Sequence, residues 1–394
     1  MRPVTAPGLY VEIVDHVGAI PAAHWDALTG DANPFVEHAF LKALEDSGSV
    51  GRGTGWIPSH LVVRGADGDG PDLAAPTAPI LGAAPLYVKT DSYGEYIFDW
   101  GWANAAHRAG IAFYPKLTAA VPFTPVTGPR LLVHPGADAE AVSAALAQGA
   151  ISLCERANLS GVHWLFCTAQ ESARLAGAGY TPRLSRQFHW HNAGYRDFED
   201  FLAAMSAKRR KEVRRERRRA QGHGLDIHVL PGTELRPEQW RALDGFYRRT
   251  VAQRGGMDYL TPRFFELLPE RLAHRVVAVI AERAGRPVAG TLNFRKGDHL
   301  YGRYWGASED LDALHFECCY YQLVDYAIAE GITLFEAGAQ GQHKLARGFL
   351  PSLTHSAHVI AHPGLRQAID AFIGREADEV RQEIAWLATH SPFR

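Results

Sequence analysis

The sequence predicts two α/β (α+β) domains in tandem, and three observations support this fold class. The chain has 394 residues, more than the size at which a single hydrophobic core keeps growing. Blocks of similar sequence recur in the same order in both halves, as expected of a duplication. In the second half, sequence patterns typical of strands are interspersed with patterns typical of helices. We therefore expect an N-terminal domain at 1–185 and a C-terminal domain at 186–394.

The repeat is carried by short blocks that keep nearly constant separations. Tyr93-Gly-Glu-Tyr96 returns 208 residues later as Tyr301-Gly-Arg-Tyr304. Further along, Ala169-Gln170 and the residues after it match Ala339-Gln340 and the residues after it, 170 positions apart. The shorter separation means that the first copy contains a segment of about 38 residues that the second lacks. This aromatic-rich insertion is expected within 97–136.

The second half shows the clearer pattern of secondary structure. Apolar runs and glycine turns predict a three-stranded antiparallel meander at 276–281, 288–294 and 300–305. Periodicity then predicts a helix, a strand, a short helix, a strand and an amphipathic helix, at 314–330, 333–337, 342–346, 353–360 and 365–387. Three helices precede the meander, at 197–221, 237–254 and 261–272. This is the order of the GNAT acyltransferase fold, and helix 139–157 and strand 163–168 occupy corresponding places in the first copy.

Composition and cysteine content indicate a cytoplasmic protein. The net charge is −2, so charge alone attracts the chain to neither nucleic acid nor membrane. The four cysteines form no CxxC pair, and the sequence contains no signal peptide and no apolar stretch of about twenty residues. We therefore expect no membrane span, no DNA partner and no metal ion. His315-Phe-Glu317 has the HxE spacing of zinc deaminases, but no PCxxC follows it.

Several long blocks are similar to a known bacterial family. They lie at 98–104, 121–130, 301–306, 314–322 and 336–349. Across nearly the whole chain, these blocks resemble the family described as peptidoglycan biosynthesis/recognition, FemAB-like. Its distant relatives, the Fem-type aminoacyltransferases, carry two GNAT-like domains and move an aminoacyl group from tRNA onto an amine of a peptidoglycan precursor. The resemblance implies an aminoacyl- or acyltransferase with aminoacyl-tRNA as donor, a peptide-like or cell-wall-precursor acceptor, and no bound cofactor.

The candidate catalytic residues are Glu336, Lys344 and Glu317. The resemblance implies that Lys344 lies at the substrate-facing cleft, where its ammonium would bind an anionic group or stabilise an oxyanion; otherwise it is a solvated cation. Glu336, at the end of a strand, either accepts a proton from the amine or pairs with a neighbouring cation. Glu317 begins a helix, where the helix dipole alone also favours a carboxylate.

Candidate substrate-binding residues come from both copies. They are Arg303, Tyr304, Gln340, His343 and Arg347 in the second copy, and Trp100 and Phe123 in the first. Arg303 and Tyr304 lie on the strand where GNAT substrates dock, and the alternation of strand faces allows only one of them to face the cleft. The aromatic residues of the first copy either wall a pocket for the acceptor or pack in the core.

The turn after the fourth strand bears on the choice of donor. In acetyl-CoA-dependent GNAT proteins, a glycine-rich turn at this point cradles the pyrophosphate with its backbone N–H groups. Here residues 306–315 include Glu309, Asp310 and Asp312 and no glycine-rich nest. The sequence therefore makes acetyl-CoA the less favoured donor.

One segment is strongly basic. Residues 208–219 contain nine Lys or Arg residues and two Glu residues. Helical spacing places Arg210, Arg214 and Arg217 on one face, with Lys211 and Arg218 beside it. Such a stripe suits the phosphates of RNA or another polyphosphate, although a solvated charged helix has the same composition.

Two other functions remain compatible with the sequence. An acyl-CoA-dependent N-acyltransferase would use the same fold and would bind CoA. A non-catalytic protein that binds peptidoglycan fragments would need neither Lys344 nor Glu336 to bind its ligand.

Overall fold

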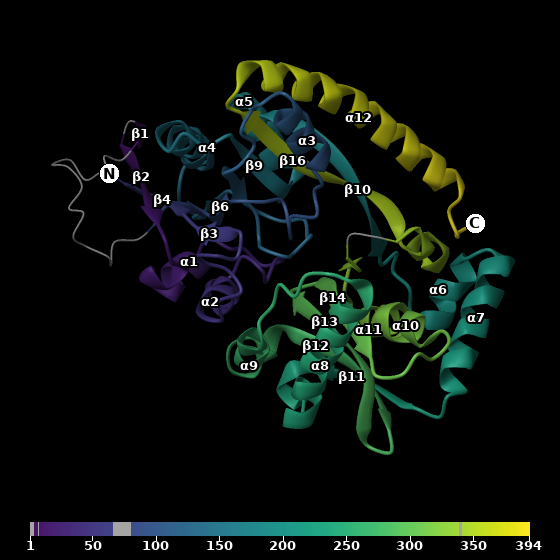
Figure 1. Cartoon of the computed structure of the whole chain (residues 1–394). Helices are drawn as coiled ribbons and strands as arrows, with labels where there is room; N and C mark the ends of the chain where they lie inside the picture. Colours follow the sequence, from purple (N-terminus) through teal and green to yellow (C-terminus); the bar gives the residue numbers. More distant parts are fainter. Residues whose placement is uncertain (1–3, 7, 66–79, 339–340) are drawn as a thin grey trace. The chain divides into compact units, whose positions relative to one another are not determined.

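The computed structural model describes residues 4–6, 8–65, 80–338 and 341–394 (Figure 1). The chain divides into two compact units. Unit 1 comprises Met1–Ser185 and Leu353–Gln382, and unit 2 comprises Arg186–Ser352 and Glu383–Arg394. The sequence analysis assigned residues 353–382 to the second domain. They belong to unit 1 because strand pairing and apolar packing hold them there.

Unit 2 is built on an antiparallel meander that is followed by one parallel strand. The strand order is β11 (Asp226–Pro231), β12 (Val276–Arg283), β13 (Arg286–Lys296), β14 (His299–Ala307), β15 (Leu334–Glu336) and β10 (Thr181–His191). β14 and β15 pair only where His299–Tyr301 lies opposite Leu334–Glu336, and β14 continues beyond that point. β10 pairs antiparallel with β15 through the residues of unit 2 from His189 to His191.

The helices of unit 2 differ in detail from the expected ones. They are α6 (Phe198–Ala204), α7 (Ala207–Gln221), α8 (Pro237–Arg254), α9 (Pro262–Arg271), α10 (Leu314–Phe316) and α11 (Gln322–Ala329), with the short turns η2 (Gly232–Glu234) and η3 (Ala273–Arg275). The helix expected at 197–221 is two helices, because Met205 is extended, buried and bridged to Phe393. The helix expected at 314–330 is interrupted by η4 (Glu317–Tyr321), a π-helical turn.

The packing of α8 on β13 and β14 requires one glycine (Figure 1). A Cβ atom on Gly306 would lie 2.2 Å from the carbonyl oxygen of Phe246 in α8. Only glycine therefore lets the helix backbone approach the strand this closely. On the sheet, Trp190, Phe335 and Phe349 are fully buried and belong to one apolar core.

Unit 1 contains two sheets. The larger has the order β16 (Leu350–Ile360), β9 (Gly161–Cys167), β7 (Lys116–Ala119), β6 (Leu86–Lys89) and β3 (Trp56–Pro58). The smaller has the order β1 (Val4–Ala6), β2 (Leu9–Val14), β4 (His60–Gly65), β5 (Gly82–Ala84) and β8 (Leu132–Val133). β7 runs parallel to β9, as β14 does to β15 in unit 2. β7 lies within the segment 97–136, so the expected insertion contributes an interior strand rather than only a loop.

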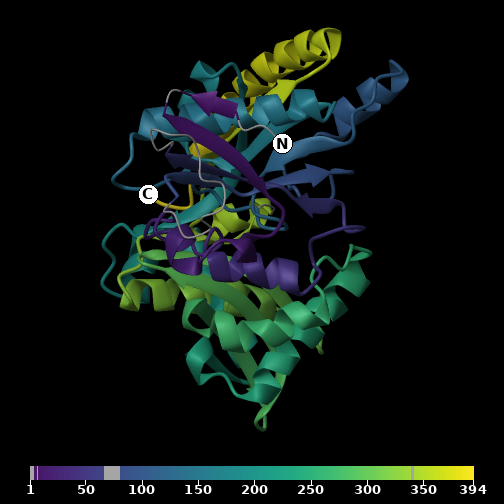
Figure 2. The ribbon, with the colours of Figure 1, turned by 90° about the vertical axis from the view of Figure 1, so that its left-hand side faces the viewer.

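The helices of unit 1 cover these sheets. They are η1 (Val17–Ala19), α1 (Ala22–Asp26), α2 (His38–Asp46), α3 (Trp100–Arg108), α4 (Ala139–Arg156), α5 (Ala169–Gly177) and the long α12 (Pro363–Thr389). α4 packs on the smaller sheet (Figure 2). Ile369 and Ile373 of α12 form an apolar cluster with Trp102 and Phe113, which explains why this part of α12 belongs to unit 1.

The antiparallel strand beside each parallel pair comes from an unexpected place in the chain. β9 pairs with β16, and β15 pairs with β10. In the sequence, however, β10 follows β9 and α5, whereas β16 follows β15 and η5 (Gln342–Arg347). The strand beside β9 is thus the one that follows β15 in the sequence, and the strand beside β15 is the one that follows β9. Among the described residues, no helix has the length and apolar character that crossing a bilayer requires.

Candidate active site

Lys344 lies in the 3₁₀-helical segment η5, which follows β15. Only 2% of the residue is exposed, and its ammonium Nζ donates a hydrogen bond of 2.6 Å to the carbonyl oxygen of Gly338. Burial lowers the pKa of Lys344 to about 8, because the charged form loses its hydration. Among the described residues, this ammonium contacts a carbonyl rather than a carboxylate. Its positive charge is therefore not neutralised by an ion pair there.

The end of η5 is anchored to the core. Gly348 has a φ of +92°, a conformation that residues with a Cβ atom avoid. A Cβ atom there would also lie 2.8 Å from the ring of Phe201. The next residue, Phe349, is fully buried with its ring centroid 5.2 Å from that of Phe335. This glycine turn and the buried ring fix the position of η5, and hence of Lys344, on the sheet.

Glu336 lies in β15 between two paired strands, opposite Tyr301 on one side and His189 on the other. The residue is buried, and its Oε2 lies 3.7 Å from Nε2 of His189. Burial lowers the pKa of His189 to about 3, so the imidazole is neutral at pH 7 and this contact is not an ion pair. Gln340, a candidate from the same segment, lies outside the described residues.

Arg347 and His343 make further contacts around η5. The guanidinium of Arg347 donates hydrogen bonds of 2.7 Å to Oε1 of Glu216 and to the carbonyl oxygen of His343. It also lies 3.4 Å from the ring centroid of Phe316. Nε2 of His343 shares a hydrogen bond of 2.9 Å with the hydroxyl of Tyr320. Arg347 therefore has internal partners, whereas His343 is exposed.

Glu317, the third catalytic candidate, is fully buried in η4. Its Oε1 accepts a hydrogen bond of 2.7 Å from Nε2 of Gln322 and lies 3.2 Å from Nη2 of Arg217. Its other oxygen, Oε2, has no hydrogen-bond partner among the described residues. These contacts show Glu317 joining η4 to the basic helix α7.

β14 carries a bulge at Arg303. Tyr304 lies opposite Leu292 and Gly302 lies opposite Asn293, so Arg303 is the extra residue and interrupts the alternation of strand faces. Its Nη2 donates a hydrogen bond of 3.3 Å to the hydroxyl of Tyr304. The two side chains thus contact each other, whereas strict alternation predicted that only one of them would face the cleft.

The basic helix α7 turns some of its cations inward. Arg210 donates to the backbone carbonyl of Met205, and Arg217 reaches the buried Glu317. Val213 is buried on the same face. Arg214 forms an ion pair with Glu199. The three arginines that helical spacing placed on one phosphate-binding face are therefore engaged with the protein itself.

A second row of cations on α7 faces the solvent. Lys208, Lys211, Arg215 and Arg218 are exposed and follow one another at intervals of three, four and three residues. This spacing places them on one side of a helix. The part of the chain that the structure describes forms no ion pair with any of the four. We call them the outer stripe; Lys211 and Arg218 belong to it, and Arg210, Arg214 and Arg217 do not.

Unit 2 also contains a cavity of about 300 Å³. Its walls are the end of α8, the end of β14 and the turn into α10, and they include Trp305 and His315. The ring centroid of His315 lies 5.3 Å from that of Trp305 and 6.2 Å from that of His343. Burial, aided by nearby cations, lowers the pKa of His315 to about 4. A neutral imidazole thus connects the cavity to the segment that carries Lys344.

The family assignment follows from the whole sequence. Residues 16–394 match the family described as peptidoglycan biosynthesis/recognition, FemAB-like. The chain belongs to the FemAB-like family. The resemblance seen in the sequence blocks is thereby confirmed. No protein with a curated description matches the sequence.

Several solved structures are similar to this FemAB-like protein over most of its length. FemX is 11% identical with a TM-score of 0.48, and the match covers 89% of this chain and 98% of FemX. L-PGS from Bacillus licheniformis is 10% identical, with the same score and coverage. A tandem GNAT protein from the clavulanic acid biosynthesis pathway is 14% identical with a TM-score of 0.43, covering 90% of this chain and 99% of that one. Identities and scores this low carry no conclusion about what this chain does. The predicted α/β class with two units is confirmed by the mixed sheets and by the division of the chain itself.

In unit 1 of the FemAB-like protein, the two aromatic candidates have different environments. Trp100 begins α3 and is 38% exposed, with its ring centroid 5.0 Å from that of Tyr93. Phe123 is 2% exposed and packs edge-on against Trp56 at 5.7 Å. Trp100 is therefore accessible to a ligand, whereas Phe123 is a core residue.

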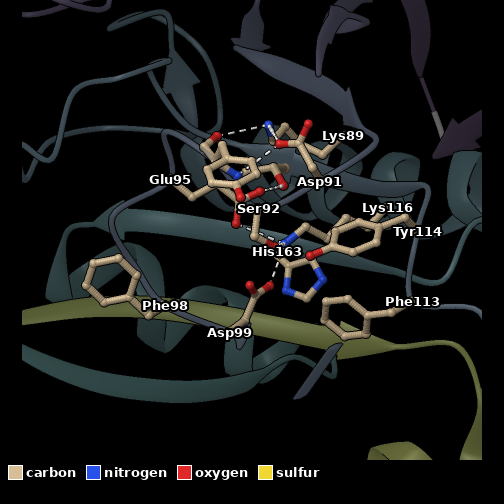
Figure 3. Close-up of polar contacts among 12 residues, drawn as sticks. Lys89, Asp91, Ser92, Glu95, Phe98, Asp99, Phe113, Tyr114, Lys116 and His163 are labelled. Carbon is tan, nitrogen blue, oxygen red and sulfur yellow. Dashed lines mark hydrogen bonds and ion pairs between the residues drawn. The ribbon is translucent and has the colours of Figure 1, made fainter. Parts of the chain in front are cut away.

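A buried cluster of charged residues surrounds Lys116 in the same unit (Figure 3). Its Nζ lies 2.9 Å from Oε2 of Glu95 and 2.5 Å from Oδ2 of Asp99, and it donates a hydrogen bond of 3.1 Å to Oγ of Ser92. Burial raises the pKa of Glu95 to about 7 although Lys116 opposes this effect. Oδ1 of Asp99 has no hydrogen-bond partner among the described residues.

This cluster was not predicted from the sequence. The available signal was a lysine at the start of an apolar run, since Lys116 precedes residues 117–123, which contain no charge. A lysine buried in a strand needs carboxylate partners, and Glu95 and Asp99 are the preceding acids in that region. Arg249 and Arg254, which line the cavity of unit 2, were also not predicted from the sequence.

Proposed function

We propose that this FemAB-like protein is an N-acyltransferase that moves an aminoacyl group from tRNA onto an amine of a peptide-like or peptidoglycan-precursor acceptor. The observation that carries the proposal is the buried ammonium of Lys344, whose partner among the described residues is a backbone carbonyl. The family description, peptidoglycan biosynthesis/recognition, supports this class of acceptor.

The reaction requires a positive charge where a carbonyl oxygen becomes negative. A neutral amine attacks the ester carbonyl carbon and forms a C–N bond, and the C–O bond to the ribose then breaks. The amine loses one proton and the ribose oxygen gains one. Between these events the carbonyl oxygen carries a negative charge, which a cation in a water-poor site stabilises. Lys344 has three N–H donors, and Gly338 uses one of them.

The role that we assign to Glu336 is to orient the acceptor amine and to accept its proton. Glu336 is the last residue of β15, and η5 with Lys344 follows a few residues later. A base and a cation placed on one short segment can act on the two ends of the same reacting bond. Glu317 receives no catalytic role in this proposal, because its contacts tie η4 to α7.

The outer stripe of α7 supports tRNA as the donor. Four exposed cations at helical spacing form a row that can follow a phosphate backbone. The ion pairs of Arg214 and Arg217 keep the helix in place, so the stripe is held on a fixed support. Binding through these cations would be sensitive to salt, since each phosphate contact releases counterions.

Transfer assays with purified full-length protein test the proposal. A mixture of aminoacyl-tRNAs is offered together with a UDP-linked peptidoglycan precursor, and mass spectrometry follows the formation of a new amide. Lys344→Met should lower kcat about 100-fold or more while leaving tRNA affinity unchanged. Lys42→Met, which removes a lysine from an exposed pair with Asp46, is the control and should keep full activity.

Two results would contradict the proposal. One is product formation by Lys344→Met at the wild-type rate. The other is turnover with an acyl-CoA but not with any aminoacyl-tRNA, which would establish the CoA-dependent alternative instead. If binding of peptidoglycan fragments survives in Lys344→Met and Glu336→Gln and no donor gives product, the protein is a binding protein rather than an enzyme.

A further inference from the structure

The cavity of unit 2 has two cations on one wall. Arg249 and Arg254 both line it from the last turns of α8. Both side chains are exposed, and neither forms an ion pair among the described residues. Arg254 is close enough to contribute to the lowered pKa of His315 and of His343. This wall therefore presents positive charge to whatever enters the cavity.

The acidic turn that also lines the cavity is mostly neutralised by ion pairs with other residues of the protein. Glu309 forms an ion pair of 2.9 Å with Arg283, and Asp312 forms one of 3.2 Å with Arg219. Asp310 is the remaining acid of this turn, and it also lines the cavity. In the described chain, the cavity lining thus contains two arginines and one carboxylate that form no ion pair. The acidic sequence of this turn argues against phosphate binding. In the folded protein, however, the two ion pairs reduce the negative charge of the turn.

The same cavity has an aromatic side. Trp305 and His315 meet edge to face, with ring centroids 5.3 Å apart and planes at 75°. The indole offers a flat surface for stacking, and the neutral imidazole can donate or accept a hydrogen bond. A volume of about 300 Å³ lies at the lower end of the range for ligand pockets, about 300–1,000 Å³. It suits one nucleotide rather than a large ligand.

We propose that this cavity binds a nucleotide, with the base against Trp305 and His315 and the phosphate on Arg249 and Arg254. The proposal extends the proposed transfer reaction by giving its donor a binding site. Two donors contain this chemistry: the 3′-terminal adenosine of an aminoacyl-tRNA and the adenosine phosphate part of coenzyme A. His315 connects the cavity to His343 of η5, so a donor held here would direct its acyl group toward Lys344.

Calorimetric titration of the full-length protein with 5′-AMP tests the site without any transfer reaction. Wild type should bind AMP, and Arg249→Gln/Arg254→Gln should weaken that binding at least about tenfold. Trp305→Leu should weaken it as well, whereas Trp305→Phe should retain most of it. The matched control is Arg241→Gln/Arg286→Gln, which removes two exposed arginines, one of them also on α8, away from the cavity.

Competition then distinguishes the two sources of the nucleotide. An RNA minihelix ending in CCA should displace AMP, and the same minihelix without CCA should not. Displacement by CoA and not by the CCA minihelix would support the nucleotide site while overturning tRNA as donor. Absence of AMP binding to wild type, or equal AMP affinity in Arg249→Gln/Arg254→Gln, would overturn the site. If Lys344→Met loses transfer activity but binds AMP as wild type does, the result supports the nucleotide site and the catalytic role of Lys344 as two separate properties.

Discussion

Arg347 donates a hydrogen bond of 2.7 Å to Glu216, and this contact joins η5, which carries Lys344, to the basic helix α7. The side chains are 8% and 20% exposed. Glu216 also accepts a hydrogen bond from the hydroxyl of Tyr321 in η4. One carboxylate of α7 thus holds two neighbouring elements, so the position of Lys344 depends on this helix.

Removing the guanidinium should therefore destabilise the protein. Arg347→Gln leaves Glu216 largely buried without its cation, and we expect a loss of about 3 kcal/mol in the free energy of unfolding. Arg209→Gln removes a pair with Glu212 that is about one-third exposed, and should cost less than about 1 kcal/mol. Urea unfolding of the two variants measures the difference. Equal losses would show that the contact with Glu216 does not support η5.

The outer stripe predicts a change in the salt dependence of tRNA binding. Lys208→Gln/Lys211→Gln/Arg215→Gln removes three exposed cations, so the slope of log K against log salt should become shallower by about 2 to 3. Filter binding at several salt concentrations gives this slope. Arg241→Gln/Arg263→Gln/Arg286→Gln matches the change in net charge elsewhere in unit 2 and should leave the slope nearly unchanged. The prediction fails if both triple variants behave alike.

Lys344 should make the free energy of unfolding depend on pH in the alkaline range. Its folded pKa of about 8 lies below the ordinary value of 10.5. Between these values the unfolded chain binds more protons, so the stability of wild type rises with pH. Lys344→Met lacks this rise and should lose stability relative to wild type between pH 8 and 10.5. Urea unfolding at pH 7, 8.5 and 10 provides the test, with Lys42→Met as reference; a constant difference would contradict the assignment.

The stability deficit of Lys116→Met should also depend on pH, but in the acidic range. The substitution leaves Glu95 and Asp99 buried without a cation and should cost about 3–5 kcal/mol at pH 7. Burial already raises the pKa of Glu95, and without the opposing charge of Lys116 this pKa would rise further, so the folded variant holds more protons than folded wild type as pH falls. The deficit should shrink between pH 7 and pH 5. Thermal unfolding across this range checks it, and a deficit that grows at pH 5 would contradict the prediction.

Much of unit 2 could be predicted from the sequence because its elements have clear local signals. The meander β12–β14 follows from apolar runs separated by Gly285 and Gly297, and α8 follows from Pro237 at its start and Gly255 at its end. β11 was missed, because Asp226–Pro231 is short and half exposed. The pairing of β10 with β15 could not be predicted, since periodicity identifies a strand but not its neighbour.

The candidate site was harder to predict because function depends on which face each residue occupies. On α7, charge spacing alone selected Arg210, Arg214 and Arg217. Val213 and Ala220 are the buried positions of that helix, and Arg210 and Arg217 lie one turn from Val213. Apolar positions would therefore have marked the inward face. At Arg303 the bulge in β14 interrupts the alternation of strand faces, so alternation does not predict which side chain faces the cleft.

The strand that pairs with β9 comes much later in the chain, and this affects how the protein is made. The larger sheet of unit 1 pairs β9 with β16, and His163 and His358 in these strands are separated by 195 residues. On a ribosome that adds about 5–20 residues per second, β16 emerges roughly 10–40 seconds after β9. During that interval one edge of β9 has no partner strand, and such edges are prone to aggregation. We therefore expect a fragment ending at residue 185 to fold poorly, and the nascent chain to complete unit 1 only after residues 353–382 have emerged.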